Sequence, residues 1–558
     1  MKPKNVLTYL VWLVIILVFA HGIYSAIELS WVCDDAFISF RYAVNLIDGH
    51  GLVFNVGEKV EGYTNFLWTI LIALGMASGI DPSALTQVLG ILSFAVTAVI
   101  LGFLSWKLFH ARARQAALFI PLSSLCLLLH RDYQVYATSG LETSWTAMLV
   151  CLGAALQILA RRKGAYLVGG LVLILAGMSR PDAMIFYVVG IAYVLIAGEK
   201  KISSVIYYLL PLIILYLPYW IIRYNYYGYP FPNTYYAKSA DLSYFKQGFL
   251  YLWLYFKTYY ILFVMIPAII WLTLKKPLIG RHMSDRIQRS ILVSLLFIVP
   301  YVFYVVKTGG DFMFARFFIP ITPVMFFLLE TSLHKLIDNN GLRYFLAALI
   351  VITVSFRFDQ YPSGGVREGI SDERFYYPPE KTEAARETGL KIREYLADTD
   401  YTVAFYGAHA MYVYYAGVPV AIESDAGLTD EYIAHLPLPR RGRVGHEKHA
   451  PVEYLYERKV NFVFKTSLPS VSTWDRLRVI TFGDYRAFVF IYENEVMEKL
   501  KQYDDVKFTD FPEFLDEYIA EMADYPDAKV REDYNFFRFY YFAHNRDPER
   551  ERPFHERM

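Results

Sequence analysis

Long apolar segments recur along the first 356 residues, and they constrain the fold of this chain more than any other feature. The first runs from residue 6 to residue 29 and holds a single charged residue, Glu28. As a helix rising about 1.5 Å per residue, it is long enough to cross roughly 30 Å of hydrocarbon. Similar or shorter segments follow, which predicts an α-helical polytopic membrane protein with about eleven transmembrane helices. They cover residues 84–109, 115–129, 143–160, 165–178, 183–197, 202–222, 259–274, 291–306, 317–333 and 342–356.

The rest of the chain, residues 357–558, is richer in charge and has no such segment, which predicts a water-soluble C-terminal domain. Over the whole chain 54 basic residues balance 53 acidic ones, which disfavours a nucleic-acid-binding protein. The 56% of hydrophobic residues exclude intrinsic disorder, and three cysteines are too few for a disulfide scaffold.

The first apolar segment could be a signal peptide, because Lys2 and Lys4 precede it. It is longer than the apolar core of a signal peptide and ends at a poor cleavage sequence, so we expect a retained membrane anchor. The short connections rich in Lys and Arg should face the cytoplasm. This orientation requires residues 66–79 to lie at the outer membrane face, or to dip into it, rather than to cross. An odd number of spans then places residues 357–558 outside the cytoplasm.

The outward connections carry acids, single basic residues and many tyrosines. Ionisable groups at a membrane boundary are costly, so they are candidates for function. In the first connection, residues 31–45, Asp34 and Arg41 lie seven residues apart and share one helical face. An aspartate there could act as a general base, and the arginine could hold a phosphate. Alternatively, Asp34 or Asp35 simply caps the helix.

Other outward segments bring polar side chains to the same membrane face. Glu61, Tyr63 and Asn65 follow glycine-rich turns and suit sugar hydroxyls, although they are equally ordinary loop residues. Snorkelling to lipid head groups is the alternative for the basic residues, and interfacial placement is the alternative for the tyrosines. The remaining candidates are Glu142, Arg180, Asp182, Asn233, Lys238, Asp311 and Arg316.

The C-terminal domain alternates helical and strand-like segments, which predicts a small α/β domain. Two polar segments, residues 425–430 and 440–448, either line an acceptor groove or are solvated connectors, and the aromatic stretch 533–544 packs on the domain or on the bilayer. Strands are expected at residues 402–406, 418–422, 462–465, 479–482 and 488–492, and helices at 383–396, 451–458 and 495–502.

Several kinds of chemistry have no motif in this sequence. It lacks a Walker A motif, a dinucleotide-binding fingerprint and a His/Cys cluster with zinc spacing. The apolar segments lack the several acids or bases of a proton relay, and no inverted repeat is evident, which disfavours a transporter. A purely structural scaffold would not explain acids and bases that converge on one membrane face.

Two long motifs, DDAFISFRY at residues 34–42 and GLVFNVGEKVEGYTN at residues 51–65, resemble the mycobacterial terminal arabinofuranosyltransferase family and its bacterial relatives. Shorter motifs resemble the same family in the same order: SGLE at 139–142, RPD at 180–182, YGYPFPNT at 227–234, GGDFM at 309–313 and GHE at 445–447. The resemblance covers about residues 31–465, and the tail beyond it diverges.

This resemblance implies a GT-C glycosyltransferase of the bacterial inner membrane. The family has many spans (here residues 1–356), a catalytic aspartate in the first outward loop (30–83) and an extracytoplasmic C-terminal domain (357–558). Its members use a polyprenyl-phosphate sugar and invert the anomeric centre. The sugar would be arabinofuranose or a related one, and the acceptor a cell-surface glycan or protein. Asp34 would be the leading base, with Asp35 supporting it or the roles exchanged.

The resemblance also suggests roles for the other polar residues. A lipid-linked oligosaccharide ligase or polymerase, or a lipid or glycan transporter, is the alternative function. The adjacent Asp34 and Asp35 permit a divalent cation without requiring one. The candidates for the donor phosphate are Arg41, Arg180, Lys238 and Arg316, and those for sugar or acceptor contacts are Glu61, Tyr63, Asn65, Glu142, Asp182, Asn233, Asp311, His446 and Glu447.

Overall fold

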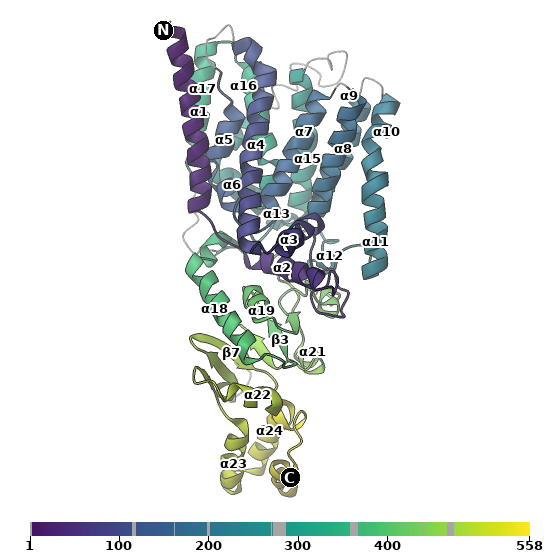
Figure 1. The fold of residues 1–558 in the computed structure, drawn as a ribbon, viewed down its shortest axis with the longest axis vertical. Helices are drawn as coiled ribbons and strands as arrows, with labels where there is room; N and C mark the ends of the chain where they lie inside the picture. The colour runs from purple at the N-terminus through teal and green to yellow at the C-terminus, as the bar shows by residue number, and fades with distance from the viewer. Residues whose placement is uncertain are drawn as a thin grey trace.

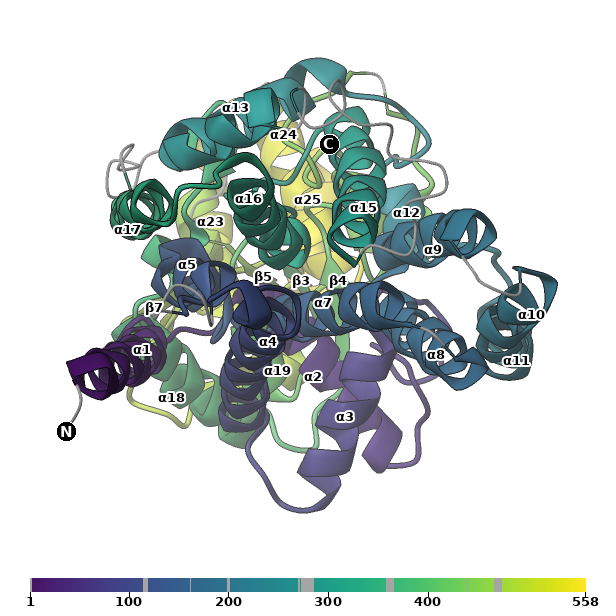
Figure 2. The same ribbon diagram turned by 90° about the horizontal axis from the view of Figure 1, so that it is seen from above.

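A helical bundle occupies one end of the molecule, and an elongated tail extends from it (Figure 1). The computed structural model describes residues 3–113, 119–160, 162–197, 201–268, 271, 286–357, 366–438, 440–465 and 474–558. The upright helices of the bundle pack side by side when seen from above (Figure 2). They are α1 (Pro3–Glu28), α4 (Pro82–Ala113), α5 (Leu122–Leu129), α7 (Thr143–Leu159), α8 (Lys163–Ser179), α9 (Met184–Ala197), α10 (Lys201–Pro211), α11 (Leu217–Tyr227), α15 (Arg286–Thr308), α16 (Thr322–Leu336) and α17 (Asn340–Ser355).

Several of these helices are long and apolar enough to cross a membrane, so the chain is a multi-pass membrane protein. In the described part of the chain four qualify alone: Thr8–Glu28, Pro82–His110, Ile202–Tyr227 and Arg286–Thr308. The third contains Pro211, and a π-helical turn at Leu212–Tyr216 follows it, because proline removes one backbone donor from the helix. The other apolar helices are shorter, and the count of eleven spans stays a prediction.

Residues 259–274 were expected to form one span, but the described part of this segment is not a single straight helix. Helix α13 (Phe245–Thr258) precedes it, and the chain bends by 107° before the helix Leu262–Ala268. The bend contains the 3-10 turn Tyr260–Val264. Most of the rest of this segment, and the start of the segment at 115–129, lie outside the described residues.

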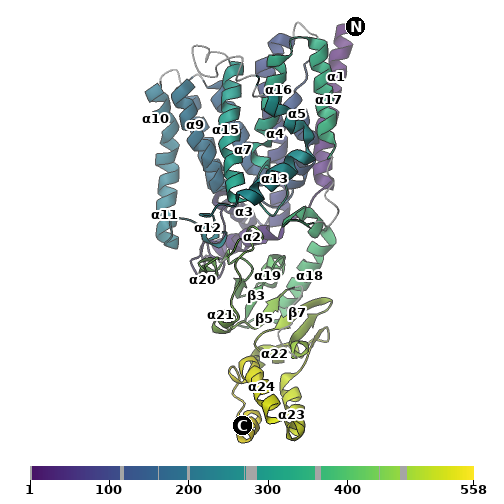
Figure 3. The same ribbon diagram turned by 180° about the vertical axis from the view of Figure 1, so that it is seen from behind.

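Two helices of the connection between α1 and α4 lie across the tail end of the bundle (Figure 3). Helix α2 (Asp34–Ile47) buries Phe37, Phe40 and Ala43 along one face, and α3 (Phe66–Ala77) packs beside it. The placement of α3 agrees with the expectation that residues 66–79 do not cross the membrane. Together the two helices form a platform between the bundle and the tail.

The tail is built on a six-stranded mixed sheet with strand order β4-β3-β5-β7-β6-β8. Strands β3, β4 and β5 are parallel, and the other pairs are antiparallel. The strands are β3 (Thr402–Phe405), β4 (Val420–Glu423), β5 (Phe462–Phe464), β6 (Val479–Phe482), β7 (Tyr485–Val489) and β8 (Val506–Phe508). The helices include α18 (Pro379–Tyr395), α19 (Ala410–Ala416), α20 (Glu431–Ala434), α21 (Val452–Glu457), α22 (Asn494–Leu500), α23 (Phe511–Glu521), α24 (Asp527–Phe537) and α25 (Pro548–Arg557).

One expected strand, residues 488–492, is misplaced by three residues. Gly483, in the left-handed region at φ +58°, closes a tight hairpin that starts β7 at Tyr485. Phe490 and Tyr492 are buried by core packing rather than by the ladder, which explains why the apolar run looked like a strand. The stretch 533–544 packs on the domain: Phe537 and Tyr540 are buried, and Tyr492 donates its backbone N–H to the carbonyl of Tyr540.

The first outward loop joins the tail through a side chain that acts as an extra strand partner. The Asn55 amide accepts from the backbone N–H of Ala421 at 2.9 Å and donates to the carbonyl of Ala421 at 3.0 Å. Ala421 lies in β4, the edge strand of the sheet, whose outer backbone groups would otherwise be unpaired. Arg41 also donates to the Asn55 oxygen and to the carbonyl of Pro419.

We expect Asn55→Ala to destabilise the junction between loop and tail. The substitution leaves a buried donor and a buried acceptor of Ala421 unpaired, which costs about 1–3 kcal/mol. Denaturant unfolding of the purified protein in detergent measures it. Asn535→Ala, at an exposed position of α24, is the control and should change the unfolding free energy little. An equal effect of both substitutions would contradict the assignment.

Candidate active site

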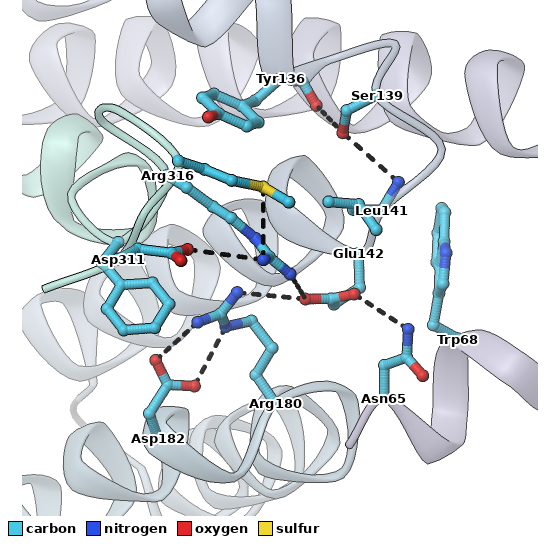
Figure 4. Close-up of polar contacts among 12 residues, drawn as sticks. Asn65, Trp68, Tyr136, Ser139, Leu141, Glu142, Arg180, Asp182, Asp311 and Arg316 are labelled. Atoms are coloured by element: carbon cyan, nitrogen blue, oxygen red, sulfur yellow. Dashed lines mark hydrogen bonds and ion pairs between the residues drawn. The ribbon is translucent and has the colours of Figure 1, made fainter. Parts of the chain in front are cut away.

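A buried network of charged side chains lies where the bundle meets the platform, and Glu142 is its centre (Figure 4). One carboxylate oxygen accepts from Arg180 at 3.1 Å and lies 3.7 Å from the guanidinium of Arg316. The other accepts from the Asn65 amide at 3.0 Å. Asn65 also bonds Ser39 of α2, so the network connects α2 to the loop before α7.

The two arginines each have a second carboxylate partner. Arg180 makes a two-pronged contact with Asp182, with both distances 3.0 Å, and Asp182 also accepts from the Tyr301 hydroxyl at 2.8 Å. Arg316 lies 3.4 Å from Asp311. Three acids therefore face two bases in a buried space. Arg180 is fully engaged in this way, which fixes its position between α8 and α15.

Arg316 is less well satisfied than Arg180. Its contacts of 3.4–3.7 Å are longer than the roughly 2.7–2.9 Å usual for charge-assisted hydrogen bonds. Its Nε is buried and has no hydrogen-bond partner among the described residues. An unsatisfied guanidinium N–H is costly when buried, so this side chain is ready to bind an added anion.

A second group of charged residues, which we call the acid–base cluster, lies beside Arg316. It consists of Asp35, Lys238, Glu373, Arg443 and His446. The backbone N–H of Ser371 donates to the carbonyl of Phe312, and the backbone N–H of Phe314 donates to the carbonyl of Ser371. These two hydrogen bonds bring Glu373 to the loop that carries Arg316. Arg443 lies 3.5 Å from Glu373 and stacks over Phe312, and His446 contacts the edge of the same ring.

The electrostatics of His446 show which groups of this cluster face one another. Burial, together with the positive charges of Arg443 and Lys238, lowers the pKa of His446 to about 4, while Asp35 and Asp425 oppose the shift. The imidazole is therefore neutral at pH 7. Asp35 is close enough to act on His446 although the two residues are far apart in the sequence.

The pKa of Glu373 is affected by some of the same charged groups. Burial raises the pKa of Glu373 to about 7, opposed by the Ser371 hydrogen bond and by Arg443, while Asp35 and Asp311 add to the increase. Asp35 itself is half-buried at the start of α2, and within the described residues its carboxylate has no hydrogen bond or ion pair. Its carboxylate is close enough to Arg316, His446 and Glu373 to act on their charges, and Lys238 and Arg443 act on the same His446.

Asp34 is positioned quite differently from its neighbour. One carboxylate oxygen accepts from the backbone N–H of Ala410 and the other from Met411, both at 2.9 Å. These donors form the N-terminus of α19, so Asp34 does cap a helix, but one in the tail rather than α2. Burial raises the pKa of Asp34 to about 7, and the two backbone hydrogen bonds oppose the shift.

Several other expected site residues are used in the junction between loop, bundle and tail. Their polar atoms have protein partners, so the structure does not bring them into the acid–base cluster. Arg41 donates to the carbonyl of Phe54, Glu61 pairs with Arg223, Tyr63 bonds Tyr227, Asn233 donates to the carbonyls of Gly427, Leu428 and Asp430, and Glu447 accepts from Arg441 and Gly442.

Sequence reasoning missed Glu373 and gave Arg443 no role. Glu373 lies between the charged residues Asp372 and Arg374, and nothing in this local sequence distinguishes it from them. Arg443 was part of a basic loop that could equally have been a solvated connector. The divalent cation that Asp34 and Asp35 would permit finds no support in the donor set, because the described residues contain no group of three or more His, Cys, Asp or Glu positioned for a metal.

The overall fold of the chain is similar to that of ArnT from Cupriavidus metallidurans. The apo structure of ArnT from Cupriavidus metallidurans superimposes with a TM-score of 0.51 at 11% identity, over 85% of this chain and 97% of that one. The same protein bound to undecaprenyl phosphate gives 0.50 at 12% identity, over 75% and 87%. At such identities the likeness is one of fold.

The sequence is distantly homologous to two terminal β-(1→2)-arabinofuranosyltransferases. The one from Mycobacterium tuberculosis is 28% identical over 321 residues, which is 51% of this chain and 50% of the relative. The one from Corynebacterium glutamicum is 29% identical over 365 residues, 58% and 51% of the two chains. The chain thus spans about half the length of the curated relatives that it matches. No known family model matches it.

We expect Glu142→Gln to destabilise the protein strongly. It removes the charge that Arg180 and Arg316 share and leaves two buried guanidinium groups close together, which costs about 3–5 kcal/mol. Denaturant unfolding measures the loss. The matched control is Glu383→Gln, which breaks an exposed pair with Arg386 and should cost less than about 1 kcal/mol. A loss no larger than that of the control would show that Glu142 is not the centre of the network.

Proposed function

We propose that this protein is an inverting GT-C glycosyltransferase that moves a sugar from a polyprenyl-phosphate donor to a hydroxyl of a cell-surface glycan. The observation that carries the proposal is Asp35, a half-buried carboxylate that has no hydrogen-bond or ion-pair partner among the described residues and lies near Arg316, in one cluster with Lys238 and Arg443. A general base needs a free carboxylate, and a phosphate needs cations, and this arrangement offers both. Distant homology to arabinofuranosyltransferases supports a pentofuranose such as arabinose as the sugar.

In the proposed reaction the acceptor hydroxyl attacks the anomeric carbon of the donor. Its proton passes to the Asp35 carboxylate, a new C–O bond forms, and the bond from the anomeric carbon to the phosphate oxygen breaks. The polyprenyl phosphate leaves with the electron pair of that bond. One carboxylate is sufficient, because inversion takes a single displacement and needs no covalent intermediate.

The cations of the cluster would stabilise the phosphate as its charge grows. Arg316 has a buried Nε without a partner, and Lys238 has no ion pair in the described part of the chain. Fixed, preorganised charges stabilise charge that develops in the transition state. His446 is neutral at pH 7 and can donate or accept a hydrogen bond to a sugar without adding charge.

The membrane supplies the donor in this proposal. The lipid tail would lie against the apolar helices while the phosphate meets the cluster at the platform of α2 and α3. ArnT, which has a similar fold, was solved with bound undecaprenyl phosphate, and this supports such a donor. The positive-inside pattern of Lys and Arg supports the placement of the tail and the site outside the cytoplasm.

Asp35→Asn should reduce sugar transfer by about 10²–10⁴-fold while donor binding is kept, because the base is lost and the cations remain. Asp34→Asn should mainly lower the unfolding midpoint, because an amide presents an N–H group to one of the two backbone donors of α19. Transfer from radiolabelled decaprenyl-phosphate arabinose to arabinan acceptors measures the first effect, and thermal unfolding measures the second.

The pair of variants separates the possible outcomes. Loss of transfer in Asp34→Asn at unchanged stability, with full activity in Asp35→Asn, would reverse the roles of the two residues. Donor binding without transfer by the wild type would reject arabinose or the chosen acceptors. No donor binding at all would favour a lipid-linked oligosaccharide ligase or a transporter.

Lys238→Gln should raise the KM for the lipid-phosphate donor by about 10–100-fold, the equivalent of one lost hydrogen bond to a charged group. The KM for the acceptor should change little. Lys246→Gln, at an exposed position of α13, is the matched control and should leave both values unchanged. If Lys238→Gln changes only the KM for the acceptor, Lys238 does not hold the phosphate.

A further inference from the structure

A cavity of about 650 Å³ lies between the first outward loop and the tail, apart from the acid–base cluster. The loop contributes Glu58, Lys59 and Val60, and the bundle side contributes Tyr229. The tail contributes the segment from Asp430 to Pro437, with Tyr454 and Arg458. The volume is in the range of about 300–1,000 Å³ that is typical of ligand sites.

The wall of this cavity is held rigidly. Arg458 donates to Asp430 and to the Tyr454 hydroxyl, and it pairs with Glu58, so one guanidinium fixes the loop to the tail. The Tyr229 hydroxyl donates to Glu431. A preformed wall costs little conformational entropy when a ligand binds.

Flat aromatic faces line the opening. The rings of Tyr432 and Tyr454 stack with their centroids 4.4 Å apart, and Tyr229 lies near His435 at 5.2 Å. Tyr432 is 49% exposed although its ring is held by Tyr454. Such rings offer apolar faces next to polar edges, which suits the two-sided surface of a sugar ring.

The charges of the cavity select against other ligand classes. Glu58, Asp430 and Glu431 face Lys59 and Arg458, so three carboxylates meet two cations and a phosphate would be repelled. An apolar chain would remove water from these charged groups without offering them hydrogen bonds in return, which is costly. A neutral ligand with many hydroxyls can pair with them, because each hydroxyl both donates and accepts.

The cavity is connected to the candidate active site by a short segment of the tail. Residues 425–430 begin at Asp425, whose charge acts on His446, and end at Asp430 in the cavity wall. A second, smaller cavity shares Lys59, Val60, Tyr229 and Glu431 with it and is also lined by Glu61 and Asn233. The cavity and the cluster therefore lie against the same short segment of the tail.

We infer that this cavity binds the part of a glycan acceptor that does not react, and that it makes the enzyme prefer longer acceptor chains. The inference rests on the proposed glycosyl transfer, since it assigns the acceptor of that reaction. The key contact is the stacking of a sugar ring on Tyr432, with Glu58 and Glu431 available to accept from its hydroxyls.

The test measures how the affinity for an acceptor depends on its length, in the wild type and in two Tyr432 variants. The purified full-length wild type and the Tyr432→Ala and Tyr432→Phe variants are titrated calorimetrically with arabinofuranose di- and hexasaccharides. The wild type should bind the hexasaccharide at least tenfold more tightly than the disaccharide. Tyr432→Ala should lose most of this gain, and Tyr432→Phe, which keeps the ring, should retain it. All three should bind the disaccharide equally.

Equal affinity of the wild type for both lengths, or an unchanged gain in Tyr432→Ala, would overturn the inference. Transfer assays with lipid-phosphate arabinose, run on the same samples, separate it from the proposed function. If length-dependent binding requires Tyr432 but no sample transfers sugar, the cavity is a glycan site and the proposed chemistry is wrong. If transfer proceeds and affinity ignores length, the chemistry stands and the cavity has no such role.

Discussion

The shared contact of Glu142 with two arginines is the interaction on which the arrangement of this site depends. Two guanidinium groups in a buried space repel each other and need a carboxylate between them. Because Arg180, Arg316 and Asn65 come from separate parts of the chain, one carboxylate fixes several loops at the membrane face. The imperfect pairing of Arg316 leaves part of its charge for another anion.

The tail completes the site rather than adding a separate domain. Asp34 caps α19, and Asn55 pairs with the edge of β4, so the first loop and the sheet are fixed together. This docking brings His446 and Arg443 over the loop that carries Arg316. It also explains why two adjacent aspartates have different environments. Asp34 accepts hydrogen bonds from the backbone of α19, whereas the carboxylate of Asp35 lies near Arg316 and has no bonded partner among the described residues.

Much of the fold could be predicted from the sequence because its signals are local. The apolar segment at 143–160 forms the helix α7 (Thr143–Leu159), and the strand expected at 479–482 is β6. The bend after α13 was not predicted, because apolar composition does not indicate the direction in which a helix runs. Within the site, the acids and bases near Glu142 could be named from their loops. The roles of Asp34 and Glu373 could not, since their partners are distant in the sequence and only the docked tail provides them.

The central claim is that Asp35 is the base of a transfer from a lipid phosphate. A structure of the wild type with a non-reactive phosphonate analogue of decaprenyl-phosphate arabinose tests it most directly. We expect phosphonate oxygens within about 3 Å of the Arg316 guanidinium and the Lys238 ammonium, with the anomeric carbon turned towards Asp35. A head group bound elsewhere, or one with Asp35 on the same side as the phosphonate, would contradict it.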